Sequence, residues 1–174
     1  MKKLNWGIIG LGTIAQKFSE AFVQTTNSVL LAVASNSSQK LESFKKQFSI
    51  DDKYVFKNYE DLVNCKEVDI VYIALPNSFH FYWIKECIDN NKNTLVEKPA
   101  TLNYAEAKSV KKILNDKNIF FGEAFMYRHH PQIDYLTSVR LLYFLVPIVV
   151  YPNNYILCNR NYPPYVVCRF WCRK

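Results

Sequence analysis

Glycines and a small residue form the first segment that could do chemistry, a G-x-G-x-x-A pattern that begins at Gly10. It lies between an apolar run and a helical pattern, where Gly10 permits a tight turn and Gly12 lets the backbone approach a pyrophosphate. Ala15 allows a helix to pack closely on a strand, and the N–H groups at Thr13 and Ile14 face the anion. The segment predicts a dinucleotide site, and a glycine-rich turn of another α/β protein is the alternative.

Two polar segments follow later apolar runs and are candidates for the same site. They are Ala74-Leu75-Pro76-Asn77-Ser78-Phe79-His80 and Glu97-Lys98-Pro99. Ligands of open α/β sheets bind at the carboxyl ends of strands, which is where both segments are expected. Taken alone, His80 could be a helix N-terminal residue without a catalytic role, and Lys98 could be a surface lysine.

Short β-rich runs alternate with helical patterns and would position these segments. The predicted strands are Leu4–Ile9, Val29–Ala34, Tyr54–Phe56, Asp69–Ala74, Asn93–Glu97 and Ile119–Gly122. The predicted helices are Thr13–Thr25, Ser38–Phe48, Tyr59–Cys65, Phe79–Asn90 and Tyr104–Asp116. We expect Asn58 to cap the third helix, Asn77 or Ser78 the fourth, and Asn103 with Glu106 the fifth.

Strands joined by helices in this order predict an α/β fold with a doubly wound parallel sheet of the Rossmann type. The length of 174 residues suits one well-buried domain and is short for two. We assign residues 1–130 to a dinucleotide-binding domain. Residues 131–174 are expected to be a linker and an atypical basic and apolar tail, not a complete second domain.

The motifs in this order resemble the cofactor-binding half of the Gfo/Idh/MocA family of NAD(P)-dependent oxidoreductases. Members of that family carry P-N-x-x-H and E-K-P at these relative places. The segment Glu123–Pro131 is similar to the one that links the two domains in the dihydrodiol dehydrogenase and glucose–fructose oxidoreductase branch. The resemblance covers roughly residues 4–138 and extends to inositol dehydrogenases of the same family.

The resemblance implies a role for each matching residue. Lys98 would be catalytic, because it would face the nicotinamide and the reacting hydroxyl, where a lysine can orient the hydroxyl, stabilise an alkoxide or transfer a proton. Glu97 and Asn77 would contact the nicotinamide-side ribose, and His80 would shape that end of the site. Arg128 would lie near the cofactor or the substrate at the domain junction.

The end of the second predicted strand bears on the choice of cofactor. NAD-selective proteins usually place a carboxylate about 20 residues beyond the glycines, but no acidic residue lies between Glu20 and Glu42. Polar groups after the strand, with charge from Lys40, would tolerate a 2′-phosphate, so NADP is preferred over NAD although no arginine stands there. The expected cofactor contacts are Gly10, Gly12, Thr13, Ile14, Ser35, Asn36, Ser37, Leu75, Pro76, Asn77, His80, Glu97, Lys98 and Arg128.

Charge and cysteine patterns exclude several classes of protein. The net charge is +7, but the lysines are scattered near glutamates on predicted helix faces, which is typical of a solvated surface rather than a nucleic-acid site. Cys168 and Cys172 lack a second ligand pair, and adjacent histidines point apart, so no metal site is expected. The run Leu141–Tyr151 is too short to cross a membrane as a helix. The five cysteines, without a signal peptide, predict reduced thiols and a cytoplasmic protein.

The composition changes after Asp134. Residues 135–174 contain no Gly, Asp or Glu, and all arginines of the chain lie at or after Arg128. This change predicts a frameshift or truncation near residues 138–141, and a genuine short tail is the alternative. Family members have a second domain that binds the substrate and often forms the dimer interface, and we expect it to be missing here.

Two hypotheses of function follow. The first is an oxidoreductase that moves a hydride between NADP(H), or NAD(H), and a secondary hydroxyl or ketone of a sugar, cyclitol or dihydrodiol. The second is a non-catalytic nucleotide-binding fragment or pseudoenzyme, because a substrate domain is needed to exclude water and to position the hydroxyl. Whether this short chain catalyses the reaction is left open, and nucleic acid and membranes are not expected as partners.

Overall fold

The computed structural model describes residues 3–125 and residue 132. The described strands are β1 (Leu4–Ile9), β2 (Ser28–Ala34), β3 (Val55–Phe56), β4 (Ile70–Ile73), β5 (Asn93–Val96) and β6 (Phe121–Glu123). The described helices are α1 (Thr13–Glu20), α2 (Ser38–Phe48), α3 (Tyr59–Asn64), α4 (Asn77–Asp89) and α5 (Tyr104–Leu114), with short 3₁₀ turns at Ala21–Gln24 and Asp52–Tyr54. Each predicted strand and helix is present, with ends that differ by a few residues.

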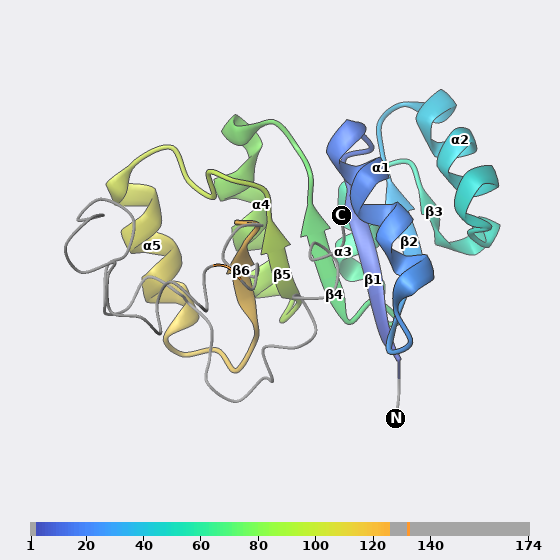
Figure 1. Cartoon of the computed structure of the whole chain (residues 1–174). Helices are drawn as coiled ribbons and strands as arrows, with labels where there is room; N and C mark the ends of the chain where they lie inside the picture. Colours follow the sequence, from blue (N-terminus) through green and yellow to red (C-terminus); the bar gives the residue numbers. More distant parts are fainter. Residues whose placement is uncertain (1–2, 126–131, 133–174) are drawn as a thin grey trace.

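All six strands form one parallel sheet in the order β3-β2-β1-β4-β5-β6 (Figure 1). The chain therefore runs outward from β1 to β3, crosses back, and continues outward on the other side from β4 to β6. This is the strand order of a doubly wound dinucleotide-binding sheet, with the change of direction between β1 and β4. The predicted Rossmann-type fold is confirmed.

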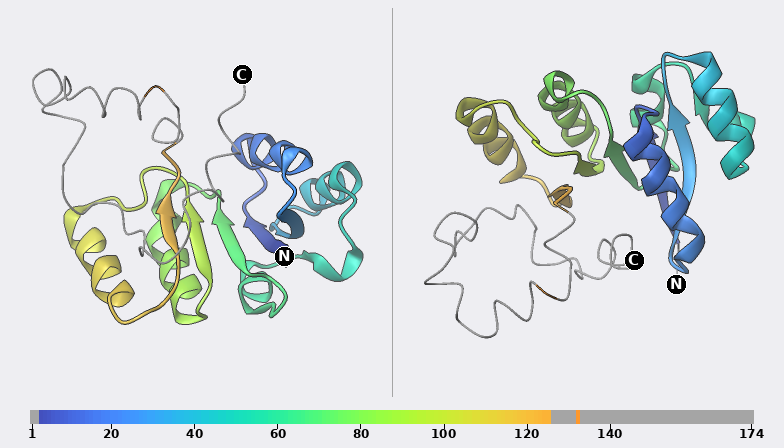
Figure 2. Two further views of the ribbon diagram at one scale, coloured as in Figure 1. Left: turned by 60° about the horizontal axis from the view of Figure 1, so that its bottom comes forward. Right: turned by 45° about the horizontal axis from the view of Figure 1, so that its top comes forward.

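The helices cover both faces of the sheet (Figure 2). Helices α1 and α2 pack on one face, through a cluster that includes Phe18 and Leu41, and α3, α4 and α5 pack on the other, through one that includes Leu62 and Ile84. Successive strand residues such as Ile8 and Ile9 contribute to opposite clusters, as the alternation of side chains along a strand requires. Burial on both faces explains why the strands read as short apolar runs.

Two of the three predicted helix caps are confirmed. Asn58 Oδ1 accepts from the N–H of Asp61 (2.8 Å), and Asn103 Oδ1 accepts from the N–H of Glu106 (3.0 Å). The prediction that Asn77 or Ser78 caps α4 is wrong. That helix begins at Asn77 itself, after Pro76, and no side chain caps it. Pro76 stands at the N-cap with an extended ψ of 144°, so the first helical residue is Asn77 and both candidate caps lie inside the helix.

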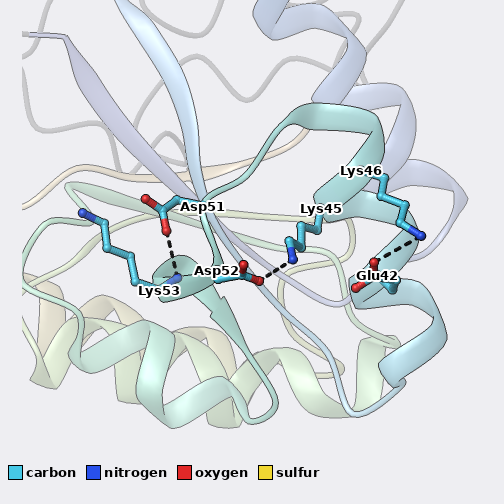
Figure 3. A network of polar contacts seen from close by, with 6 residues as sticks. All are labelled: Glu42, Lys45, Lys46, Asp51, Asp52 and Lys53. Atoms are coloured by element: carbon cyan, nitrogen blue, oxygen red, sulfur yellow. Dashed lines mark hydrogen bonds and ion pairs between the residues drawn. The ribbon is translucent and has the colours of Figure 1, made fainter.

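The lysines at the end of α2 pair with neighbouring carboxylates (Figure 3). Lys45 forms an ion pair with Asp52, and Lys46 lies 3.3 Å from Glu42. A hydrogen bond with Asp52 is the main cause that raises the pKa of Lys45. Lys45 is partly buried and the other three side chains are exposed, which matches the solvated face that the charge pattern predicted. Ion pairs at a surface contribute little to stability. Within the described residues, none of the helices has the length and apolar character needed to span a bilayer.

Substitution of Ala15 tests the packing of α1 on the sheet. Ala15 is fully buried in the cluster on that face, so Ala15→Leu should lower the free energy of unfolding by about 1–3 kcal/mol through overpacking. Gln16 is exposed, and Gln16→Leu should change it by less than about 0.5 kcal/mol. Urea unfolding followed by tryptophan fluorescence measures both, and equal effects of the two variants would contradict close packing.

Candidate functional site

The turn after β1 requires glycine at its first position. Gly10 has a φ of +87°, a conformation that side chains disfavour. Its N–H donates to the carbonyl oxygen of Ala34 (3.1 Å), which continues the pairing of β1 with β2. A Cβ at this position would lie 2.6 Å from the carbonyl oxygen of Ala74, so the loops after β1 and β4 are in direct contact. The predicted tight turn at Gly10 is confirmed.

Gly12 stands at the N-cap of α1 for a different reason. Its φ of −97° is open to any residue, and a Cβ there would meet no atom of the described residues within 4 Å, its chain neighbours apart. No side chain caps α1, whereas Ser37, Asn58 and Asn103 cap the N-termini of α2, α3 and α5. No contact among the described residues requires glycine at this place, and glycine leaves room for an anion to approach the N–H groups of the helix. The residues therefore fit a bound pyrophosphate.

The loop after β4 is held by a buried histidine. His80 on α4 has no exposed surface, with Nε2 2.7 Å from the carbonyl oxygen of Leu75 and Nδ1 2.8 Å from that of Pro99. Each ring nitrogen therefore lies within hydrogen-bond distance of a backbone carbonyl oxygen, one from each loop. The ring joins the loop that contains Leu75, Pro76 and Asn77 to the loop that contains Lys98.

The segment after β5 presents a half-buried carboxylate beside an exposed lysine. Glu97 Oε1 accepts from the hydroxyl of Tyr72 (2.5 Å), and Glu97 Oε2 accepts from the N–H of Lys98 (3.3 Å). Burial is the main cause that raises the pKa of Tyr72, and the hydrogen bond to Glu97 adds to it, so the neutral phenol is the donor. The peptide between Lys98 and Pro99 is cis. The side chain of Lys98 is exposed.

Two residues of this region were missed by reasoning from sequence. Tyr72 reaches Glu97 from β4, and Glu123 Oε1 at the end of β6 accepts from the N–H of Ala100 (2.8 Å). A polar residue at the carboxyl end of a predicted strand was the signal that could have found Glu123. For Tyr72 the sequence offered no such signal, since it lies inside an apolar strand.

The hydroxyls after β2 mostly serve the loop itself. The Oγ of Ser35, which is buried, accepts from the N–H of Ser37 (3.2 Å), and the Oγ of Ser37 accepts from the N–H of Lys40 (3.4 Å) as the cap of α2. Asn36 and Lys40 are exposed. The N–H of Ser35 donates to the carbonyl oxygen of Phe56 (3.2 Å), which ties this loop to the end of β3.

The predicted site residues meet at the carboxyl ends of neighbouring strands. The loops at Gly10, Leu75 and Lys98 follow β1, β4 and β5, which are adjacent in the sheet, and the loop at Ser35 follows β2 on the other side. Arg128 lies outside the described residues, as do all but one residue of the predicted tail at 131–174. Among the described residues no group of three His, Cys, Asp or Glu side chains could hold a metal ion.

This fold and site define a dinucleotide-binding α/β domain, and comparison with known proteins gives its family. Residues 4–125 match the GFO_IDH_MocA family, an oxidoreductase family with an NAD-binding Rossmann fold. The chain belongs to that family.

Characterised relatives show the same relationship over the same part of the chain. The chain is 32% identical over 126 residues to D-xylose 1-dehydrogenase (NADP(+)) 2 from Haloferax volcanii. The matched segment covers 72% of this chain and 38% of the relative. The chain is 28% identical over 128 residues to trans-1,2-dihydrobenzene-1,2-diol dehydrogenase from Xenopus tropicalis, and the match covers 72% of this chain and 38% of the relative. The chain thus spans about two fifths of the length of these relatives.

Solved structures agree on the fold. The scyllo-inositol dehydrogenase of Lactobacillus casei superposes with a TM-score of 0.74 at 24% identity, over 79% of this chain and 41% of that one. A 3-ketoreductase from Actinomadura kijaniata, solved in complex with NADP, superposes with a TM-score of 0.72 at 26% identity, over 79% and 44%.

The two glycines should respond differently to the same substitution. Gly10→Ala should lower the free energy of unfolding by about 2–4 kcal/mol, because it combines a positive φ with a contact to the Ala74 carbonyl. Gly12→Ala should lower it by less than about 1 kcal/mol, the difference between glycine and alanine at an N-cap. Urea unfolding of both variants beside the wild type measures this. Equal destabilisation would show that Gly12 is also required by internal packing.

Proposed function

We propose that this chain binds NADP(H), or NAD(H), and supplies the cofactor half of an oxidoreductase site. The reaction would move a hydride to or from a secondary hydroxyl or ketone of a sugar, cyclitol or dihydrodiol. The observation that carries the proposal is Gly12, where a Cβ would meet no atom within the described part of the chain, at the start of an uncapped helix. In this assignment residues 1–130 form the cofactor domain.

Different groups of the described residues would contact different parts of the proposed cofactor. The N–H groups of Thr13 and Ile14 at the start of α1 would donate hydrogen bonds to the pyrophosphate, and the positive end of the helix dipole would attract its charge. Asn77 and Glu97 would contact the ribose on the nicotinamide side, where Glu97 is held ready by Tyr72. Leu75, Pro76 and the loop that His80 supports would line that end.

Lys98 is the residue we assign to the chemistry. When bound, the nicotinamide supplies the acceptor or donor of the hydride. The exposed side chain of Lys98 would hydrogen-bond to the reacting oxygen of the substrate. In ketone reduction its ammonium would donate a proton to the developing alkoxide, and in alcohol oxidation its neutral amine would accept the proton of the hydroxyl. Arg128, beyond the described residues, would contribute from the junction with the substrate side.

The relatives support the substrate class and the preference for NADP. One is a D-xylose dehydrogenase that uses NADP(+), and another is a dihydrodiol dehydrogenase. In this chain no carboxylate follows β2, Asn36 and Lys40 are exposed beside the loop, and Ser35 and Ser37 place hydroxyls there. These groups favour a 2′-phosphate over a free ribose hydroxyl pair.

A second candidate is dinucleotide binding without turnover by the chain itself. The observation that favours it is the coverage of about two fifths of each relative's length. Reduction of NADP by the pure chain with D-xylose or a trans-dihydrodiol, followed at the NADPH absorbance band, separates the two candidates. Turnover excludes the second candidate, and binding without turnover supports it.

We also place the protein in the cytoplasm, since the described cysteines Cys65 and Cys87 are free thiols.

Gly12→Ala tests the pyrophosphate site. The added methyl should weaken NADPH binding by at least about tenfold, because it blocks charge-assisted hydrogen bonds from the helix start. Val23 is 88% exposed after the other end of α1, and Val23→Ala serves as the matched control with unchanged affinity. Isothermal titration calorimetry measures the dissociation constants. Unchanged affinity of Gly12→Ala would contradict the placement of the pyrophosphate.

Ser37→Asp tests the choice between NADP and NAD. Aspartate caps a helix as well as serine does, so α2 should remain intact, while its charge repels a 2′-phosphate. We expect a loss of NADPH affinity of about tenfold or more with NADH affinity unchanged or improved. Titration of the wild type with both reduced cofactors is the reference. Tighter binding of NADH than NADPH by the wild type would contradict the preference for NADP.

A further inference from the structure

Three consecutive backbone groups around Lys98 are held by side chains from three different elements. The N–H of Lys98 donates to Glu97 Oε2 (3.3 Å), the carbonyl oxygen of Pro99 lies 2.8 Å from His80 Nδ1, and the N–H of Ala100 donates to Glu123 Oε1 (2.8 Å). These side chains come from the end of β5, from α4 and from β6. Side chains from three elements of the fold therefore hold this loop, although the loop itself lies beyond the end of β5.

The register of the sheet explains how Glu123 reaches this loop. Glu123 pairs with Val96 on the last rung between β5 and β6, and the next N–H, that of Ala124, donates to the carbonyl oxygen of Val96 (2.8 Å). Glu123 thus stands beside the final residue of β5, and its carboxylate extends past the strand end to Ala100. A shift of register by one residue would turn the side chain to the other face.

The bond between Glu123 and Ala100 is of a strong kind. A carboxylate that accepts from a backbone N–H forms a charge-assisted hydrogen bond, and Ala100 is only 8% exposed. Removal of the acceptor would leave a nearly buried N–H without its partner, which disfavours the present loop conformation. The loop would then relax at the peptide two residues after Lys98.

We propose that Glu123 is a positioning residue for Lys98, acting through the N–H of Ala100. This inference rests on the proposed function, because it assumes that the Lys98 side chain lies against the nicotinamide end of a bound cofactor. Glu123 would touch neither cofactor nor substrate. His80 on α4 contacts the carbonyl oxygen of Pro99, one residue before Ala100. Together, His80 and Glu123 would hold the backbone from which the Lys98 side chain extends.

The test measures how well bound NADPH shields the Lys98 amine in the full chain. Lysines are acetylated with a limiting amount of acetic anhydride, with and without saturating NADPH, and the modified peptides are quantified by mass spectrometry. The variants are Glu123→Gln, which keeps an acceptor oxygen, and Glu123→Leu, which removes it. Lys85 and Lys108, both exposed on helices, are the internal standards.

Glu106 offers a matched control on the same stretch of chain. Its Oε2 accepts from the N–H of Leu102 (2.9 Å). This bond between a carboxylate and the backbone has a similar length and lies further along the same loop, next to α5. Glu106→Leu should destabilise the start of α5 without effect on the shielding of Lys98. Thermal unfolding and NADPH affinity of every variant report on general damage, which would lower both.

We expect NADPH to slow acetylation of Lys98 in the wild type, Glu123→Gln and Glu106→Leu, and to lose about tenfold of that protection in Glu123→Leu, the effect of one charge-assisted hydrogen bond. NADPH affinity should change little, because the glycine turn lies at the other end of the site. Full protection in Glu123→Leu would overturn the inference, as would equal loss in Glu106→Leu. Failure of the wild type to bind NADPH, or to protect Lys98, would overturn the proposed function and this inference with it.

Discussion

The contact between the turn after β1 and the loop after β4 governs the rest of the site. Gly10 approaches Ala74 so closely that a Cβ would lie 2.6 Å from its carbonyl oxygen. This approach is forced, because β1 and β4 are parallel neighbours whose chains leave the sheet for opposite faces. Helices α1 and α4 therefore start side by side and diverge, and these are the two helices of the sheet's flanks that begin without a side-chain cap. A serine or asparagine side chain caps the first turn of α2, α3 and α5, whereas the first turns of α1 and α4 have no such cap.

Tyr72 connects this arrangement to the hydrophobic core. Its ring packs on Phe18 of α1 at 4.2 Å between centroids, within an aromatic group that also includes Trp6 and Phe22. Its hydroxyl nevertheless reaches Glu97. The packing that holds α1 on the sheet thus also fixes the carboxylate beside Lys98, so the two ends of the site share one side of the core. A buried phenol retains its proton and is a reliable donor, which suits it to orient a carboxylate.

The sequence predicted the elements and their order well, and the cross-strand contacts poorly. The strands, the helix starts at Asn58 and Asn103, and the turn at Gly10 follow from local patterns of a few residues, and all are confirmed. The bonds of Tyr72 with Glu97 and of Glu123 with Ala100 join residues 25 and 23 positions apart. They depend on which strands are neighbours and in what register, and no local pattern contains that information. The start of α4 was misjudged because proline, rather than a polar side chain, opens the helix.

The two ends of the site are built by different physical means. At Gly10 a positive φ and the contact with Ala74 leave no room for a side chain, and at Gly12 a Cβ would meet no atom of the described residues at the start of an uncapped helix. Around Lys98 the opposite holds, because charged and polar side chains grip the backbone and leave the lysine side chain exposed. The four-carbon side chain of lysine is flexible, so its ammonium can occupy many positions. When the backbone of Lys98 is held in place, the volume that the ammonium can reach is smaller. If the proposed roles hold, a methyl group added at Gly12 should alter binding, and removal of the Glu123 carboxylate should alter the positioning of Lys98.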